Sequence, residues 1–191
     1  GLSSIACVIY GFSFYLLGDY ALSVISFATL GVLVPFYYYN VFGDANKHKK
    51  IFMGDTGSLT IGLILAVLGT ILFIHPDSAK ISISTPILAF SPLIVPCFDV
   101  IRVYILRIRQ HHSPFLPDKN HIHHKILAAG MKPRAAMITI VSVSLMFTVI
   151  NVTLSSLLSV NINIIIILDI LLWGLSNIYL SRLIKKRNVT A

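Results

Sequence analysis

Six long apolar runs, separated by short polar segments, restrict this chain to a membrane-spanning helical fold. A helix of about 20 apolar residues is roughly 30 Å long, which matches the hydrocarbon core of a bilayer. Only 12% of the residues are charged, whereas soluble domains carry about 25%. We therefore predict an all-α, polytopic transmembrane bundle that forms a single domain over residues 1–191. The predicted spans are 2–17, 20–39, 57–74, 84–106, 135–158 and 162–180.

The basic residues predict which side of the membrane each loop occupies. Threading the six spans places residues 40–56, 107–134 and 181–191 on one side, with thirteen Lys and Arg residues. The other side holds only Lys80. The positive-inside rule then predicts that the two loops and the C-terminal tail are cytoplasmic. A formal net charge of +8 does not indicate nucleic-acid binding here, because the basic residues flank apolar runs.

The first cytoplasmic loop ends in the segment Phe52-Met53-Gly54-Asp55-Thr56-Gly57-Ser58. One interpretation is a helix cap, because Asp, Thr and Ser side chains accept hydrogen bonds from unpaired amides. The other is a phosphate and metal site at a helix N-terminus. In that case Gly54 and Gly57 allow close approach of the backbone to a ligand, and Asp55 supplies a hard oxygen for Mg²⁺. The spacing alone does not choose between the two.

The second cytoplasmic loop contains a cluster of histidines within residues 107–125. We expect Asp118 to cap a short helix that runs to Gly130. On that helix His121, His124 and Lys125 would share one face, and His123 would point elsewhere. Three interpretations stay open: a basic amphipathic segment on anionic headgroups, a zinc site, and a set of Arg, Lys and His donors for a diphosphate.

One acidic residue in the fourth predicted span has an obvious partner. Asp99 precedes Arg102 by three residues, so the two side chains can pair on one helix face near the membrane interface. We expect Asp99 to have a structural or positioning role rather than a catalytic one.

The two loop motifs together resemble those of the polyprenyl-phosphate N-acetylhexosamine-1-phosphate transferases, which form part of glycosyltransferase family 4. The second motif reads Ser113-Pro114-Phe115-x-Pro117-Asp118-Lys119-x-His121-Ile122-His123-His124. The resemblance covers nearly the whole chain, and its His-Ile-His-His form is similar to the N-acetylglucosamine branch. It implies a bacterial enzyme of the inner membrane that transfers N-acetylhexosamine 1-phosphate from a UDP-sugar to undecaprenyl phosphate and releases UMP.

The resemblance also implies roles for individual residues. Asp55 would bind Mg²⁺, with Mn²⁺ as a substitute ion, and His121 and His124 would be catalytic. Phe52 would stack on uracil, and Asn40 would contact the nucleotide. The remaining predicted substrate-binding residues are Gly54, Gly57, Ser58, Arg107, Arg109, Lys119 and His123. Besides the UDP-sugar and undecaprenyl phosphate, the predicted partners are membrane lipid and a second copy in a homodimer.

One departure from the family pattern affects the predicted activity. The family carries an Asp-Asp pair and an Asn-x-x-Asp-Gly motif upstream, and this chain has neither. Gly1-Leu2-Ser3-Ser4 resembles the end of that second motif, so we expect a C-terminal fragment that is inactive alone. The alternatives are a catalytically incomplete membrane subunit and a small transporter.

Overall fold

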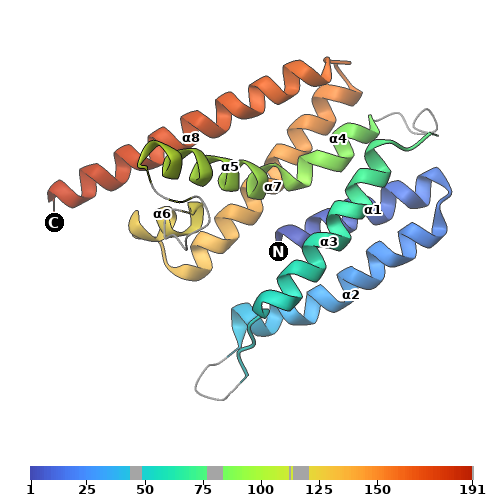
Figure 1. Cartoon of the computed structure of the whole chain (residues 1–191), viewed down its shortest axis with the longest axis horizontal. Coiled ribbons are helices and arrows are strands. Elements are labelled where there is room, and N and C mark those ends of the chain that lie inside the picture. Colours follow the sequence, from blue (N-terminus) through green and yellow to red (C-terminus); the bar gives the residue numbers. More distant parts are fainter. Residues whose placement is uncertain (44–48, 77–83, 112, 114–120, 191) are drawn as a thin grey trace. The chain divides into compact units, whose positions relative to one another are not determined.

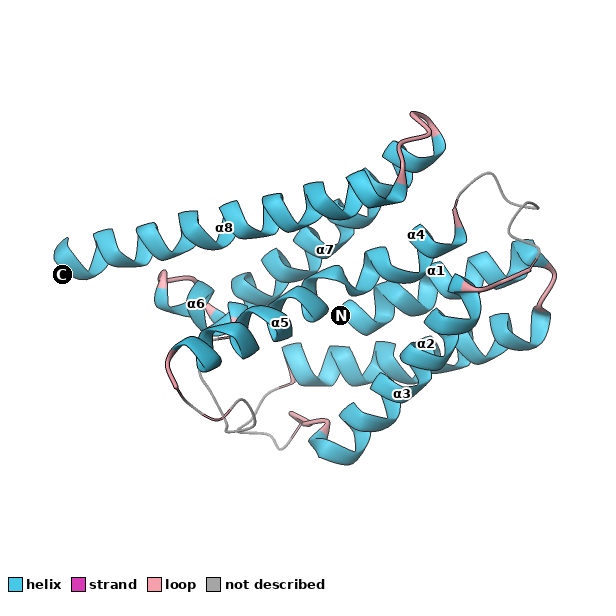
Figure 2. Cartoon of the chain, turned by 45° about the horizontal axis from the view of Figure 1, so that its top comes forward, coloured by secondary structure: helices cyan, strands magenta, loops and turns pink. Residues whose placement is uncertain are grey.

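A computed structural model describes residues 1–43, 49–76, 84–111, 113 and 121–190, without the side chains of residues 186–190. Every regular element in this part of the chain is a helix (Figures 1 and 2). The helices are α1 (Leu2–Leu17), α2 (Tyr20–Phe42), α3 (Gly54–Phe73), α4 (Thr85–Phe90), α5 (Ile94–Arg109), α6 (Ile122–Ala128), α7 (Pro133–Ser156) and α8 (Ile162–Thr190), with the 3-10 turn η3 (Ser91–Leu93) between α4 and α5.

The predicted all-α transmembrane fold is confirmed. Among the described residues, five helical segments are long and apolar enough to cross a membrane, and α1 is a shorter apolar helix. The last helix differs from its prediction, because α8 continues ten residues beyond the predicted end of the span, to Thr190. Its final turns carry Arg182 and Lys185, which end the apolar run but are good helix formers.

The chain divides into two compact units. The first contains α1 to α4, η3 and the end of α7 from Thr148. Within it α1 packs against α2, α3 and α4, and in both views α1 and α2 lie side by side (Figures 1 and 2). Their shared core is apolar and includes Ala6, Cys7, Tyr10, Phe14, Leu65, Leu68, Leu72 and Leu88.

The fourth predicted span is interrupted where α4 gives way to η3. Pro92 has no N–H to donate, so the α-helical ladder is broken at this point. Two buried side chains lie against the interruption. Tyr10 Oη donates to the carbonyl of Ala89 at 2.5 Å, and Asn151 Nδ2 donates to Ser91 Oγ at 3.2 Å.

At the opposite end of α3 from the Asp55 segment, a polar contact joins two turns of the first unit. His75 Nε2 lies 2.7 Å from Asp19 Oδ2. The contact links the α1–α2 turn to the end of α3.

The second unit contains α5, α6, α7 up to Phe147, and α8. In this unit α6 packs against α8. Many apolar side chains of α8 are exposed, among them Ile164, Ile167, Ile170, Leu171 and Leu175. Exposed apolar residues over a long helix are expected where the helix contacts lipid.

Candidate active site

The Asp55 segment begins α3 in the first unit. The N-terminal cap residue is Met53, and no side chain there makes a capping hydrogen bond. Ser58 Oγ instead donates to the carbonyl of Asp55 at 2.9 Å. The capping interpretation of this segment is therefore wrong. The carboxylate of Asp55 is exposed in the first turn and makes no hydrogen bond or ion pair within the described residues.

Backbone conformation at the start of α3 favours close contact with an anion. Gly54 adopts φ +64°, a left-handed conformation that glycine adopts without steric cost. The residue is exposed, so the first amides of α3 are accessible at this end of the helix. A helix N-terminus carries partial positive charge and unpaired N–H groups, which together bind phosphate or carboxylate.

Predicted nucleotide-contacting residues lie around the same turn. Phe52 is 78% exposed, and Lys50 Nζ lies 5.7 Å from the centre of its ring. Asn40, near the end of α2, donates from Nδ2 to the carbonyl of Ile51 at 2.8 Å. This bond ties α2 to the loop that presents Phe52. The first unit thus brings together Asn40, Phe52, Gly54, Asp55, Gly57 and Ser58.

An apolar cavity of about 570 Å³ lies beside this loop, between α2 and α3. Phe52 and Gly57 line its end nearest the Asp55 segment, and Leu33, Phe36 and Ile61 are among the other lining residues. The start of α3 therefore offers polar backbone groups next to an apolar surface.

The histidine cluster lies in the second unit at the start of α6. The helix begins at Ile122, with His121 as its cap residue, so the prediction of a start at Asp118 is wrong. Asp118 and the predicted substrate-binding residue Lys119 lie outside the described residues. The predicted end is confirmed, because α6 stops at Ala128 and Gly130 adopts φ +95°.

Asp99 of α5 caps α6 from a distance of 23 residues in the sequence. Both of its carboxylate oxygens lie 3.1 Å from the amide nitrogen of Ile122, and Oδ2 lies 2.9 Å from His121 Nδ1. Arg102 Nη2 donates to Oδ1 at 2.8 Å, which confirms the predicted pair. Asp99 is only 6% exposed, so a buried carboxylate sets the position of the histidine cluster. No pattern in the sequence predicts this contact with His121.

The three imidazoles of the cluster lie together. The rings of His121 and His123 are nearly parallel with centres 6.0 Å apart, and those of His123 and His124 are 4.0 Å apart. The prediction that His123 points away from the other two is therefore wrong. Partial burial lowers the pKa of His123, and the positive charges that His124 and His121 can carry lower it further. The nearby carboxylate of Asp99 opposes these effects.

The arginines predicted to contact substrate differ in exposure. Arg107 is buried at 8% exposure, whereas Arg109 is exposed at the end of α5. Within the described residues, no three His, Cys, Asp or Glu side chains are grouped as a metal site. The substrate roles of the arginines and histidines stay predictions.

Comparisons with known proteins agree with the two motifs. The family model "Glycosyl transferase family 4" matches residues 1–73. The undecaprenyl-phosphate alpha-N-acetylglucosaminyl 1-phosphate transferase of Salmonella typhi is 29% identical over 153 residues, which are 80% of this chain and 40% of that protein. The enzyme of the same name from Escherichia coli (strain K12) is 30% identical over 73% of this chain and 37% of its own length.

A third relative is also similar. The probable undecaprenyl-phosphate N-acetylglucosaminyl 1-phosphate transferase of Bacillus subtilis (strain 168) is 35% identical over 82% of this chain and 40% of its own length. The chain therefore spans about 40% of the length of these curated relatives. No solved structure matches it.

Proposed function

Because this chain belongs to glycosyl transferase family 4, we propose that it forms part of an enzyme that transfers N-acetylglucosamine 1-phosphate from a UDP-sugar to undecaprenyl phosphate. The observation that carries the proposal is the exposed carboxylate of Asp55 on the first turn of α3. This turn lies within the residues that the family model matches. The enzyme would be a multi-pass protein of the bacterial inner membrane, with its motif loops in the cytoplasm.

The residues at the start of α3 fit a magnesium ion. Mg²⁺ in phosphate-using enzymes is held by one or two carboxylates together with substrate phosphates and water. Asp55 provides one exposed carboxylate, and the α3 N-terminus provides amides for the phosphates. When bound, Mg²⁺ or Mn²⁺ would neutralise the diphosphate and make its phosphorus more electrophilic.

The reaction must bring two anions together. A phosphate oxygen of undecaprenyl phosphate attacks the phosphorus attached to the sugar, the bond from that phosphorus to the UMP oxygen breaks, and UMP leaves. Two unit charges 4 Å apart repel by about 4 kcal/mol at an effective dielectric of 20. Positioned positive charge and N–H donors therefore carry much of the catalytic effect.

Residues of this chain would hold the donor at both of its ends. Phe52 offers an exposed ring for stacking on uracil, and the α3 amides would bind the diphosphate. His121, His124 and Arg109 would donate hydrogen bonds to the diphosphate and sugar. His121 Nδ1 donates a hydrogen bond to the carboxylate of Asp99. Nε2 of the same ring can then donate to the substrate when the imidazole is protonated, and can accept a hydrogen bond when it is neutral. The apolar cavity beside Phe52 would accommodate part of the polyprenyl chain.

Substitution of Asp55 tests the proposal most directly. In the complete protein that contains this chain, we expect Asp55→Asn to lower Mg²⁺-dependent UMP release by about 100-fold or more. Removal of one group that stabilises charge in the transition state typically has an effect of this size. UMP is measured with UDP-N-acetylglucosamine and undecaprenyl phosphate as substrates. Asp55 is exposed, so the melting temperature should not change.

A matched control is Asp19→Asn, which removes an acidic side chain from the opposite end of the first unit and should leave UMP release unchanged. Near-normal UMP release by Asp55→Asn would overturn the metal-site assignment. Transport of a UDP-sugar without UMP release would favour the transporter alternative. Because the 191-residue chain contains no Asp-Asp pair, we also expect no UMP release from this chain alone.

A further inference from the structure

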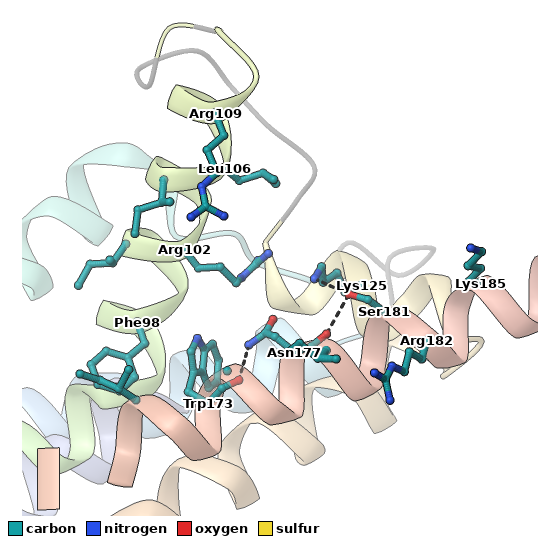
Figure 3. A pocket seen from close by; sticks show the side chains of 15 residues that line it. Phe98, Arg102, Leu106, Arg109, Lys125, Trp173, Asn177, Ser181, Arg182 and Lys185 are labelled. Atoms are coloured by element: carbon teal, nitrogen blue, oxygen red, sulfur yellow. Dashed lines mark hydrogen bonds between the residues drawn. The ribbon is translucent and has the colours of Figure 1, made fainter. Parts of the chain in front are cut away.

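A groove of about 800 Å³ lies between α5, α6 and α8 of the second unit. Its lining changes from apolar to cationic along both long helices (Figure 3). Phe98 and Trp173 lie together at the apolar end, with ring centres 6.5 Å apart. The two helices diverge from this end, and farther along α5 carries Arg109 and α8 carries Lys185.

The cationic end has a surplus of positive charge. Its basic side chains come from three helices, and no carboxylate is among the described residues that line the groove. The nearby carboxylate of Asp99 already accepts hydrogen bonds from Arg102 and Ile122. The basic lining residues are Arg102, Arg109, Lys125, Arg182 and Lys185.

Lys125 is a partly buried member of this basic set. Its Nζ donates to Ser181 Oγ at 3.1 Å, so the side chain is directed from α6 toward α8. Partial burial lowers the pKa of Lys125, the positive charge of Arg102 lowers it further, and Asp99 opposes both effects. An anion in the groove would therefore interact favourably with both cations.

Two unsatisfied polar atoms lie between the apolar and cationic ends. Trp173 and Asn177 are 8% and 7% exposed, and both line the groove. Asn177 Nδ2 donates to the carbonyl of Trp173 at 3.0 Å. The buried Nε1 of Trp173 and Oδ1 of Asn177 have no hydrogen bond within the described part of the chain. Such atoms are uncommon in native proteins, and here they offer one donor and one acceptor to a ligand.

The four-residue spacing of Trp173, Asn177, Ser181 and Lys185 places these side chains on one face of α8. Each step rises about 6 Å along the helix. The groove therefore presents, in order, an apolar surface, a neutral polar level and a cationic level, as Figure 3 shows along α8.

We propose that this groove binds one anionic glycerophospholipid with a hydroxyl-bearing headgroup, of the phosphatidylglycerol type. Its phosphate would lie among the basic side chains, and an ester carbonyl would accept from Trp173 Nε1. A headgroup hydroxyl would donate to Asn177 Oδ1, and the acyl chains would cover Phe98 and Ile101. Undecaprenyl phosphate has a phosphate and a hydrocarbon chain but no ester carbonyl, so it would leave the indole N–H unsatisfied.

The proposal does not depend on the transferase activity. The lipid would contact α6 through Lys125 and α8 through Trp173 and Lys185, and would thereby hold α6, with its histidines, against α8. Basic pockets between membrane helices are known to bind anionic lipid headgroups.

Native mass spectrometry of the complete protein tests the proposal. The protein is released from nanodiscs that contain equal amounts of phosphatidylglycerol and phosphatidylcholine. We expect one phosphatidylglycerol to be retained in preference to phosphatidylcholine. Arg182→Gln and Lys185→Gln should each reduce retention about five-fold, the expected effect of one basic residue near an anionic headgroup. The matched control Lys132→Gln removes an exposed charge that does not line the groove and should have no effect.

A second measurement locates the lipid. Trp173 is the single tryptophan of this chain, so phosphatidylglycerol with brominated acyl chains should quench the fluorescence component that Trp173→Phe removes. Asn177→Leu should weaken retention of phosphatidylglycerol more than that of phosphatidic acid, which has no headgroup hydroxyl. Equal retention of phosphatidylcholine, no retained lipid, or no quenching of the Trp173 fluorescence would each overturn the proposal.

Discussion

The carboxylate of Asp99 and the imidazole of His121 lie 2.9 Å apart, between Oδ2 and Nδ1, although 22 residues separate them in the sequence. The same carboxylate accepts a hydrogen bond from the amide of Ile122, the first residue of α6, and another from the guanidinium of Arg102. One buried group therefore fixes the start of the histidine-bearing helix and the orientation of its first histidine.

Removing the charge of Asp99 should reduce activity without direct loss of a substrate contact. We expect Asp99→Asn to lower kcat for UMP release by about 10- to 100-fold, since a hydrogen bond to a charged group contributes roughly 1.5–3 kcal/mol. The measurement is steady-state UMP release by the complete protein, with the melting temperature recorded in parallel.

A double variant separates positioning from simple destabilisation. Asp99→Asn leaves the largely buried Arg102 without its carboxylate partner, which can itself reduce stability. Combining it with Arg102→Gln restores the charge balance but not the contact with His121. We expect the double variant to recover the melting temperature but to keep the low kcat. Recovery of kcat together with stability would mean that Asp99 has only a structural role.

The helices were largely predictable because their apolar runs are long and their lengths match a bilayer. The start and end of α1 agree with the prediction, and α2, α3, α7 and α8 begin within three residues of the predicted starts. The Asp99–Arg102 pair was predictable as well, because helical geometry brings residues three apart together. Local periodicity was sufficient for these features.

Contacts between distant segments were not predictable from local patterns. The cap of α6 comes from Asp99 on another helix, whereas the loop sequence predicted a cap at Asp118. The stacking of His123 on His121 depends on the non-helical backbone of His121, the cap residue. A prediction that assumes helical spacing through His121 is therefore wrong for His121 and His123. Three prolines lie in the fourth predicted span, but they did not predict the position of the interruption at Ser91–Leu93.

His123 should have a pKa below the ordinary value for a histidine. Burial and the neighbouring His124 and His121 lower its pKa from 6.5. Below pH 6.5 the unfolded chain then binds more protons at this position than the folded chain. Its contribution to stability is therefore present above pH 6.5 and is lost as the pH falls through the folded-state pKa.

Histidine-selective NMR of the complete protein measures this titration. We expect the midpoint of His123 to lie below 6.5 and to rise in His124→Gln, which removes one neighbouring positive charge. Lys132→Gln, outside the cluster, should leave the midpoint unchanged. A midpoint at or above 6.5 would contradict the arrangement of the three rings.

The exposed ring of Phe52 should matter for nucleotide use and not for folding. Stacking of an aromatic side chain on a base contributes roughly 1–3 kcal/mol, so we expect Phe52→Ala to raise KM for the UDP-sugar by about ten-fold. Ile51→Ala is the matched control, because Ile51 is exposed in the same loop but has no ring. An unchanged KM in Phe52→Ala would remove Phe52 from the nucleotide site.

The stability of the first unit should depend on the hydrogen bond between α1 and the interrupted span. Tyr10 is fully buried, and its hydroxyl donates to the carbonyl of Ala89. Tyr10→Phe keeps the ring but leaves that carbonyl without this donor, at a cost of about 1–3 kcal/mol. We expect the apparent melting temperature of the detergent-solubilised protein to fall by roughly 3–10 °C. Tyr15→Phe removes a hydroxyl from an exposed residue of the same helix and should change it by less than about 1 °C. Equal effects of the two substitutions would mean that the Tyr10 hydroxyl does not stabilise the interruption, and that apolar packing around Pro92 is sufficient.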